Sequence, residues 1–204
     1  KIKKYYKFTK SELAGLVFAV IVIGFIISFK EWGADDFNAR AGLLNLFNSI
    51  LIVALSFLVH DAGQRIWGLA IGLRIQNKAF TYGLVAGLFL AFVTNGQLWL
   101  VLPSSFIVHH MAGHRLGFFR YDINDFAKAM IAFGGILSTL TLMILFKIIG
   151  TFVSNALIDK VIIFNAIYLI TIMIPIPPLD GSVIYFGSRM LYAFLFPFVL
   201  VSSL

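Results

Sequence analysis

Residues 161–181 read VIIFNAIYLITIMIPIPPLDG. The stretch is apolar and carries no charged residue before Asp180. We expect a membrane helix over residues 161–176, which ends where Pro175 and Pro177 can no longer continue it. An ionisable group at membrane depth is costly and is a functional candidate by default. The stretch therefore predicts a membrane helix that leads to a functional carboxylate.

Five further apolar runs flank this one. Hydrophobic residues make up 60% of the 204 positions and charged residues only 12%, whereas a soluble domain has about half and about a quarter. Too few polar groups remain to cover a globular surface, so lipid must solvate much of the chain. We predict a single multi-pass, all-α membrane domain over residues 1–204. Its full spans are residues 11–29, 41–71, 126–149, 161–176 and 183–204, and an interrupted run covers residues 79–108.

The net charge of +7 is placed along the expected membrane boundaries. Five lysines precede the first apolar run, and the other basic residues flank later runs. This pattern predicts a cytoplasmic N-terminus and contact with anionic lipid headgroups rather than with nucleic acid. We expect an integral protein of the plasma membrane. The absence of cysteine excludes disulfides and thiolate metal ligands.

The run at residues 79–108 is broken by Gly83, Gly87 and Pro103. Basic residues stand on both of its flanks, so both flanks are expected on the cytoplasmic side. The run would then enter and leave the membrane on one face, as a re-entrant hairpin that turns near residues 94–97. Non-helical backbone at that depth needs protein or water to satisfy it. The alternative is a sixth full span.

Polar residues gather late in the second run, where residues 60–64 read HDAGQ. With the hairpin topology, His60, Asp61 and Asp180 all lie toward the cytoplasmic side. We therefore predict that they can meet in one polar pocket. The alternative role is structural: a hydrogen-bonded polar pair between helices, to which Gln64, one turn on, supplies further bonds.

Two of these motifs resemble those of site-2 proteases, which are intramembrane zinc proteases. That family carries His-Glu-x-x-His in its second helix and Asn-x-x-Pro-x-Pro-x-Leu-Asp-Gly in a later one. The chain has HDAGQ at residues 60–64 and IMIPIPPLDG at residues 172–181. Between them, residues 134–139 resemble the family's Ala-Gly-Pro-Leu-Ala-Asn. Residues 82–107 are similar to a glycine-rich insert of some archaeal members.

The resemblance implies a zinc site at His60, Gln64 and Asp180, with Asp61 as the general base. It also implies a helix break that ends one helix and restarts another. The positions with this structural role are Pro175, Pro177 and Gly181.

Three departures from the family pattern argue against catalysis. Gln64 offers a neutral amide, a poor zinc ligand, where the family has a second imidazole. Asp61 is one methylene shorter than Glu, so its carboxylate withdraws from a water positioned for the longer side chain. Ile172 replaces the Asn that holds substrate in the family. The chain is predicted to be a site-2-protease-like pseudoprotease without a cofactor, acting as a structural or accessory subunit of a membrane assembly.

Two alternative functions stay open. The first is an active zinc-dependent intramembrane metalloprotease that uses Asp61 as its base. The second is a metal-binding membrane protein that uses a histidine cluster, His109, His110 and His114, part of which would share a face if residues 108–116 were helical. Contacts with other membrane subunits are expected within the bilayer through small residues, namely Gly15, Gly24, Gly83 and Gly87.

Overall fold

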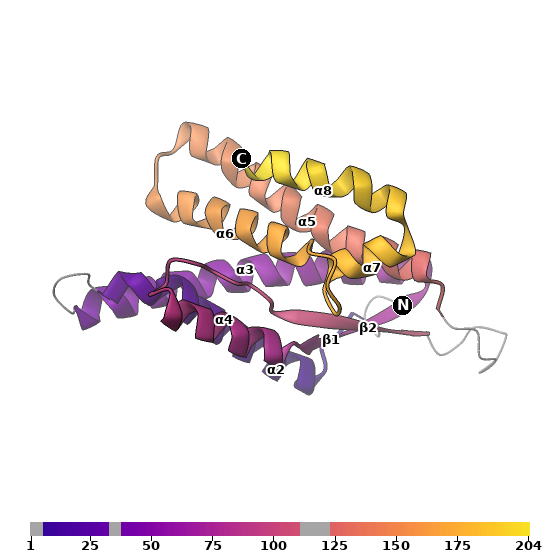
Figure 1. Cartoon of the computed structure of the whole chain (residues 1–204), viewed down its shortest axis with the longest axis horizontal. Helices are drawn as coiled ribbons and strands as arrows, with labels where there is room; N and C mark the ends of the chain where they lie inside the picture. The colour runs from indigo at the N-terminus through magenta and orange to yellow at the C-terminus, as the bar shows by residue number, and fades with distance from the viewer. Residues whose placement is uncertain (1–5, 33–37, 111–122) are drawn as a thin grey trace.

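The computed structural model describes residues 6–32, 38–110 and 123–204, and most of these residues are helical (Figure 1). In chain order the elements are α2 (Lys10–Ser28), the 3-10 turn η1 (Phe29–Trp32), α3 (Ala39–Ile71), β1 (Leu73–Ala79), α4 (Thr81–Val93), β2 (Ser104–His110), α5 (Asp125–Phe152), α6 (Ala156–Ile172), α7 (Asp180–Gly187) and α8 (Arg189–Ser203). The prediction of a mostly helical fold is confirmed, and the structure adds a two-stranded sheet that was not predicted.

Polar caps fix where the helices begin. Thr9 Oγ1 accepts from the backbone N–H of Glu12, whose carboxylate accepts from Thr9 N, so a capping box starts α2. Asparagine side chains accept backbone N–H groups at the starts of α3, α5 and α6. Each cap satisfies a donor that the first helical turn leaves unpaired. Helix α6 therefore begins at Ala156, earlier than the predicted span of residues 161–176, and it ends at Ile172, before the prolines.

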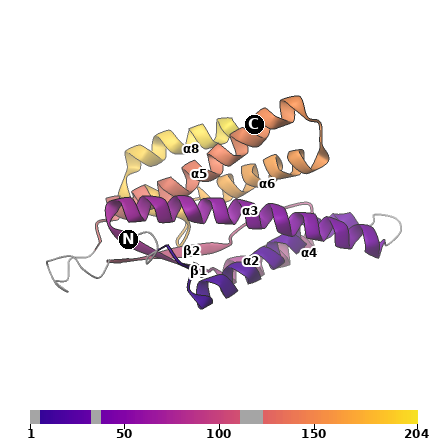
Figure 2. The ribbon, with the colours of Figure 1, turned by 180° about the vertical axis from the view of Figure 1, so that it is seen from behind.

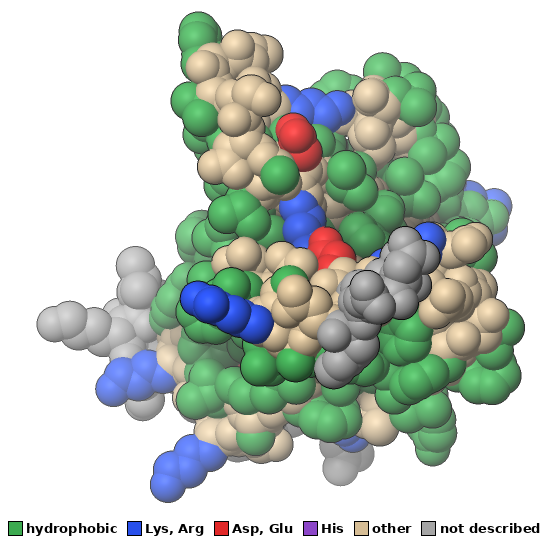
Figure 3. Space-filling view, turned by 90° about the vertical axis from the view of Figure 1, so that its left-hand side faces the viewer, with side chains coloured by type: hydrophobic (Ala, Val, Ile, Leu, Met, Phe, Trp, Pro, Cys, Tyr) green, Lys and Arg blue, Asp and Glu red, His purple; other side chains and the backbone are tan. Residues whose placement is uncertain are grey.

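Within the described residues, three helical segments are long and apolar enough to cross a membrane, namely residues 10–32, α3 and α5. Helices α4 and α8 are apolar but shorter. Their exposed side chains are largely hydrophobic. Figure 3 views the molecule from one end, where the Asp and Glu side chains lie toward the middle, Lys and Arg side chains lie there and at the margins, and hydrophobic side chains cover much of the rest. These features are compatible with a membrane protein.

Helix α3 runs through the middle of the molecule, with α2 and α4 on one side and α5, α6 and α8 on the other (Figures 1 and 2). Its crossing with α5 is close because both helices carry glycine there. A Cβ on Gly63 would lie 2.5 Å from the carbonyl oxygen of Gly134, and a Cβ on Gly134 would lie 2.8 Å from Trp67 Cβ. Small residues at helix crossings allow such an approach. The crossing places His60 of α3 against α5.

The two ends of the interrupted run lie side by side. Strands β1 and β2 pair in antiparallel register from Leu73 opposite His110 to Ala79 opposite Ser104. Between them the chain runs out along α4, turns at residues 94–97 and returns without helix. Asn95 and Gly96 adopt positive φ angles of 51° and 70° in this turn. The excursion is therefore a helix and an extended return, joined at its base by a β ribbon.

The last predicted span, residues 183–204, is two helices in the structure. Helix α7 starts at Asp180 and ends at Gly187, and Ser188 is extended (φ −160°, ψ 100°) before α8. Ser188 Oγ accepts from Leu191 N and caps α8. A Cβ on Gly187 would overlap the carbonyl oxygen of Asp125. Close packing of α7 on α5 thus explains the break, which apolar composition did not reveal.

The small residues expected to contact partner subunits pack instead within the chain. A Cβ on Gly24 would lie 2.8 Å from Ile50 Cγ1, and a Cβ on Gly87 would lie 2.6 Å from Leu100 O. Gly83 faces Phe80 and Leu102 in the same way, and Gly15 faces Ala79. These four glycines therefore contribute to packing of α2 and α4 inside this chain, and their contact with partner subunits stays a prediction.

Candidate functional site

His60, Gln64 and Asp180 lie together in the structure. His60 and Gln64 are one turn apart on α3 and share a face, and Asp180 is the first residue of α7. His60 Nε2 lies 2.8 Å from Asp180 Oδ2, and Gln64 Nε2 lies 2.9 Å from the same oxygen. All three residues are buried. The fold thus brings together the two motifs that the sequence analysis singled out.

The second ring nitrogen of His60 faces α5. Its Nδ1 atom lies 3.0 Å from Thr139 Oγ1. Thr139 Oγ1 donates its one proton to Gly135 O at 3.1 Å, so it can only accept from His60. The hydrogen-bond network therefore assigns a proton to His60 Nδ1. Thr139 orients the imidazole so that Nε2 faces Asp180.

The polar groups of the site satisfy one another. The short separation of His60 Nε2 and Asp180 Oδ2 requires a proton between them, because two bare acceptors repel. Gln64 turns its NH2 group toward the carboxylate, which accepts this hydrogen bond. Tyr168 closes one side, with its ring centroid 5.4 Å from that of the imidazole. The result is a buried network in which each named donor has an acceptor.

Two glycines make room for this network. A Cβ on Gly135 would lie 2.8 Å from His60 Nε2 and 2.6 Å from Gln64 Cγ. A Cβ on Gly181 would overlap the carbonyl oxygen of Met173 at the end of α6. Glycine at position 181 is thus required where α7 restarts beside the end of α6, as expected for a residue of the helix break.

Asp61 faces a different group of residues from His60. Its Oδ2 atom accepts from Arg65 Nε at 3.0 Å, and Arg65 Nη2 donates to Glu12 Oε1 at 2.8 Å. Glu12 Oε1 also accepts from the backbone N–H of Asn77 at 3.0 Å. This buried ion-pair network connects α2, α3 and β1. Sequence reasoning assigned Asp61 the position of a general base and did not identify the network.

The residues at the implied zinc positions do not form a complete zinc-ligand set. His60 and Asp180 are side chains of the types that bind zinc, whereas the amide NH2 of Gln64 donates to Asp180 Oδ2 and lies 3.1 Å from His60 Nε2, so no lone pair of its nitrogen is offered to a metal. Within the described part of the chain, no group of three or more His, Cys, Asp or Glu side chains is arranged to hold a metal ion. A catalytic zinc site needs three protein ligands and an open position.

Of the alternative histidine cluster, His109 is separated from this site along strand β2. His109 and His110 lie at the end of strand β2, so this part of the chain is not the helix that would align His110 with His114. His114 lies outside the described residues. Ser104 at the other end of β2 lines a pocket with His60, and the extended strand from Ser104 to His109 spans roughly 16 Å.

Four residues of these networks were missed as site residues. Thr139 is the last residue of the motif at residues 134–139 but was given no role there, and Tyr168 is a lone aromatic hydroxyl in an apolar helix that no motif marks. Glu12 and Arg65 carry a clearer signal, because a lone acid in an apolar run needs a partner and Arg65 stands one turn after Asp61. Their pairing across α2 and α3 could not be read without the fold.

Comparisons of the chain with family models, curated proteins and solved structures find no match. The resemblance to site-2 proteases therefore stays a prediction from the motifs at residues 60–64 and 172–181.

Proposed function

We propose that the chain is a site-2-protease-like pseudoprotease that serves as a non-catalytic subunit of a membrane protein assembly. The observation that carries this proposal is the contact of Gln64 with His60 and Asp180. An amide donor at the position of the third ligand fills the site with hydrogen bonds that a zinc ion would have to displace. The buried network is then an architectural device that joins α3, α5 and α7.

The environment of Asp61 supports the same proposal. A general base must reach the water or group from which it takes a proton. One oxygen of Asp61 is engaged by Arg65, which is itself paired with Glu12. This arrangement ties the carboxylate to α2 and β1, so the residue at the position of the base contributes to packing of the bundle.

The proposal is tested with a membrane-embedded peptide reporter and the purified full chain in lipid vesicles containing zinc. We expect no cleavage by the wild type and by Asp180→Asn alike, because no complete ligand set holds a hydrolytic ion. Purification from native membranes in mild detergent is expected to yield other integral proteins at a fixed ratio. Cleavage by the wild type that is lost in Asp180→Asn would contradict the proposal.

The proposed membrane topology places α4 and its extended return as a re-entrant hairpin. The paired ends of this segment at β1 and β2 support it, because both would lie on the cytoplasmic side.

The chain lacks cysteine, so each single-cysteine variant reports the accessibility of one position only. Impermeant maleimide is expected to label Lys78→Cys and His109→Cys from the same side of the membrane. The exposed Arg40→Cys, at the start of α3, should label from the opposite side. Labelling of His109→Cys from the side that labels Arg40→Cys would establish a full span.

A further inference from the structure

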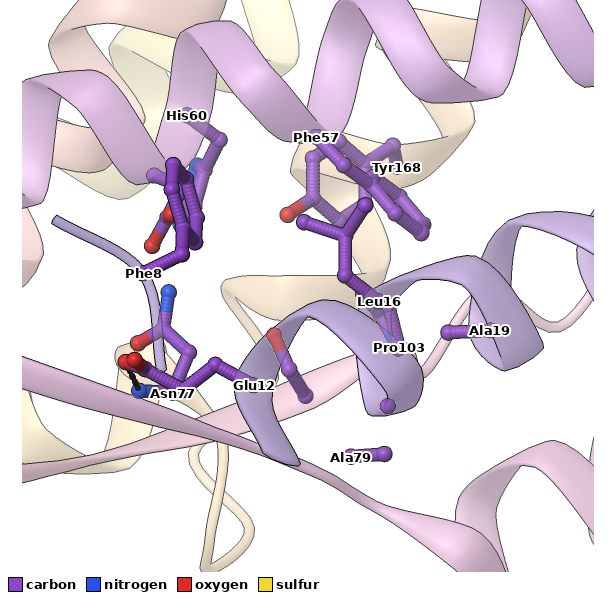
Figure 4. A pocket seen from close by; sticks show the side chains of 13 residues that line it. Phe8, Glu12, Leu16, Ala19, Phe57, His60, Asn77, Ala79, Pro103 and Tyr168 are labelled. Carbon is purple, nitrogen blue, oxygen red and sulfur yellow. Dashed lines mark hydrogen bonds between the residues drawn. The ribbon is translucent and has the colours of Figure 1, made fainter. Parts of the chain in front are cut away.

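A larger cavity lies beside the candidate site, bounded by α2, α3, α6 and the end of the β ribbon next to α4 (Figure 4). Glu12, Asp61 and Asn77 line its polar part. Phe57 and Tyr168 line its apolar part, and Figure 4 shows both rings on the opposite side of the cavity from Glu12 and Asn77. The cavity is therefore amphipathic: the oxygen atoms of Glu12 and Asn77 lie across it from the rings of Phe57 and Tyr168, and the Phe8 ring lies on the polar side.

Two buried acceptor oxygens in the lining of this cavity have no hydrogen-bond partner among the described residues. They are Asp61 Oδ1 and Asn77 Oδ1. Asp61 is only 2% exposed, and its other oxygen is held by Arg65. A buried carboxylate oxygen without a partner costs free energy. The two atoms come from different elements, α3 and β1, so a ligand donor placed between these elements would satisfy them.

The formal charges of the ion-pair network also indicate a cation. Glu12 and Asp61 each carry one negative charge and share the single positive charge of Arg65, which leaves one negative charge. All three residues are buried. Both oxygens of Glu12 already accept hydrogen bonds, from Thr9, Arg65 and Asn77. The uncompensated charge therefore has its free acceptor at Asp61 Oδ1.

We propose that this cavity binds a primary ammonium group that carries an apolar or aromatic tail. An ammonium supplies three N–H donors and one positive charge, which match the free oxygens and the residual charge. Phe57 and Tyr168 supply apolar surface for the tail, and Phe8 lies at the cavity between His60 and Asn77 in Figure 4. A bare calcium or magnesium ion would need about six or more oxygen ligands, and a neutral donor would leave the charge uncompensated. The proposal stands independently of the proposed function.

The test is calorimetric titration of the full chain in nanodiscs with phenethylammonium at pH 7, with lipid-only nanodiscs subtracted. We expect saturable binding, and phenethyl alcohol, which has the same shape without the charge, should bind at least about tenfold more weakly. Asp61→Asn is expected to weaken phenethylammonium binding by about tenfold or more, because a charged acceptor is replaced by a neutral one.

Asn77→Ala keeps the test decisive if Asp61→Asn fails to fold, because only the side chain of Asn77 is removed and its backbone bond to Glu12 remains. This variant is expected to weaken binding about threefold to tenfold. The matched control is Asn45→Ala, whose side chain lies in another part of α3 near Glu31; its affinity should equal that of the wild type.

Two forms of the probe distinguish the source of the amine. Tighter binding of an acetylated, amidated Phe-Lys dipeptide than of phenethylammonium assigns the site to a lysine side chain of a partner polypeptide, and the reverse order assigns it to a small free amine. Absence of saturable binding would overturn the proposal. Equal binding of the amine and the alcohol, or unchanged binding in Asn77→Ala, would overturn it as well.

Discussion

Gln64→His is expected to convert the site into a zinc-binding site. In the wild type the relevant atoms of His60, Gln64 and Asp180 lie 2.8–3.1 Å from one another. Two ligands about 2.0–2.1 Å from a tetrahedral zinc would be about 3.3 Å apart, so little movement is needed. The substitution replaces an amide donor by an imidazole acceptor. We expect zinc affinity to rise by more than about 100-fold, because loss of even an outer partner of a zinc ligand costs about 10–100-fold.

The measurement is zinc per chain by mass spectrometry after equilibration with a zinc buffer and removal of free metal. Gln76→His is the matched control, since it adds one histidine on β1, at a residue outside the contacts that join His60, Gln64 and Asp180. It should bind no more zinc than the wild type. The double variant Gln64→His with Asp180→Asn should lose the gain. Equal zinc content in Gln64→His and Gln76→His would show that the three positions do not form the geometry described.

Arg65→Met is expected to destabilise the protein strongly. The guanidinium is 2% exposed and pairs with Asp61 at 3.0 Å and with Glu12 at 2.8 Å. Its removal leaves two buried carboxylates without their cation. Breaking a buried pair in this way costs about 3–5 kcal/mol of unfolding free energy. The apparent melting temperature in detergent should fall accordingly, and adding Glu12→Gln and Asp61→Asn should restore part of the loss.

Lys128→Met provides the comparison for this prediction. Lys128 pairs with Asp125 at 2.9 Å within one turn of α5, but both side chains are exposed. An exposed pair of this kind contributes less than about 1 kcal/mol. If Arg65→Met and Lys128→Met lowered the melting temperature equally, the buried network would not hold α2, α3 and β1 together.

Apolar runs predicted the helices because each needs only local sequence. Helix α3 was placed within two residues of its observed start at Ala39. The sheet was not predicted because β1 fell in the connection between the predicted runs at residues 41–71 and 79–108, and β2 fell largely within the second of these runs. Their pairing depends on contacts between residues that are far apart in sequence. The break at Ser188 was missed for the same reason, since the approach of Gly187 to Asp125 is a tertiary contact.

The candidate site was predictable at positions where an ionisable side chain stands beside an apolar run. His60 and Asp180 are ionisable groups next to apolar runs, and the topology predicted from charge allowed them to meet, as they do at 2.8 Å in the structure. The orientation of Gln64 and the role of Thr139 were not predictable. Both depend on which donors and acceptors of the neighbouring groups are already engaged in other hydrogen bonds. Asp61 was grouped with His60 by adjacency in sequence, although successive residues on a helix point to different neighbours.

Zinc content of the purified wild-type chain tests the central claim most directly. If hydrogen bonds from His60 and Gln64 complete the surroundings of Asp180, zinc after equilibration should stay far below one ion per chain and should be the same in His60→Ala. One zinc ion per wild-type chain, lost in His60→Ala, would contradict the claim and identify a working metal centre.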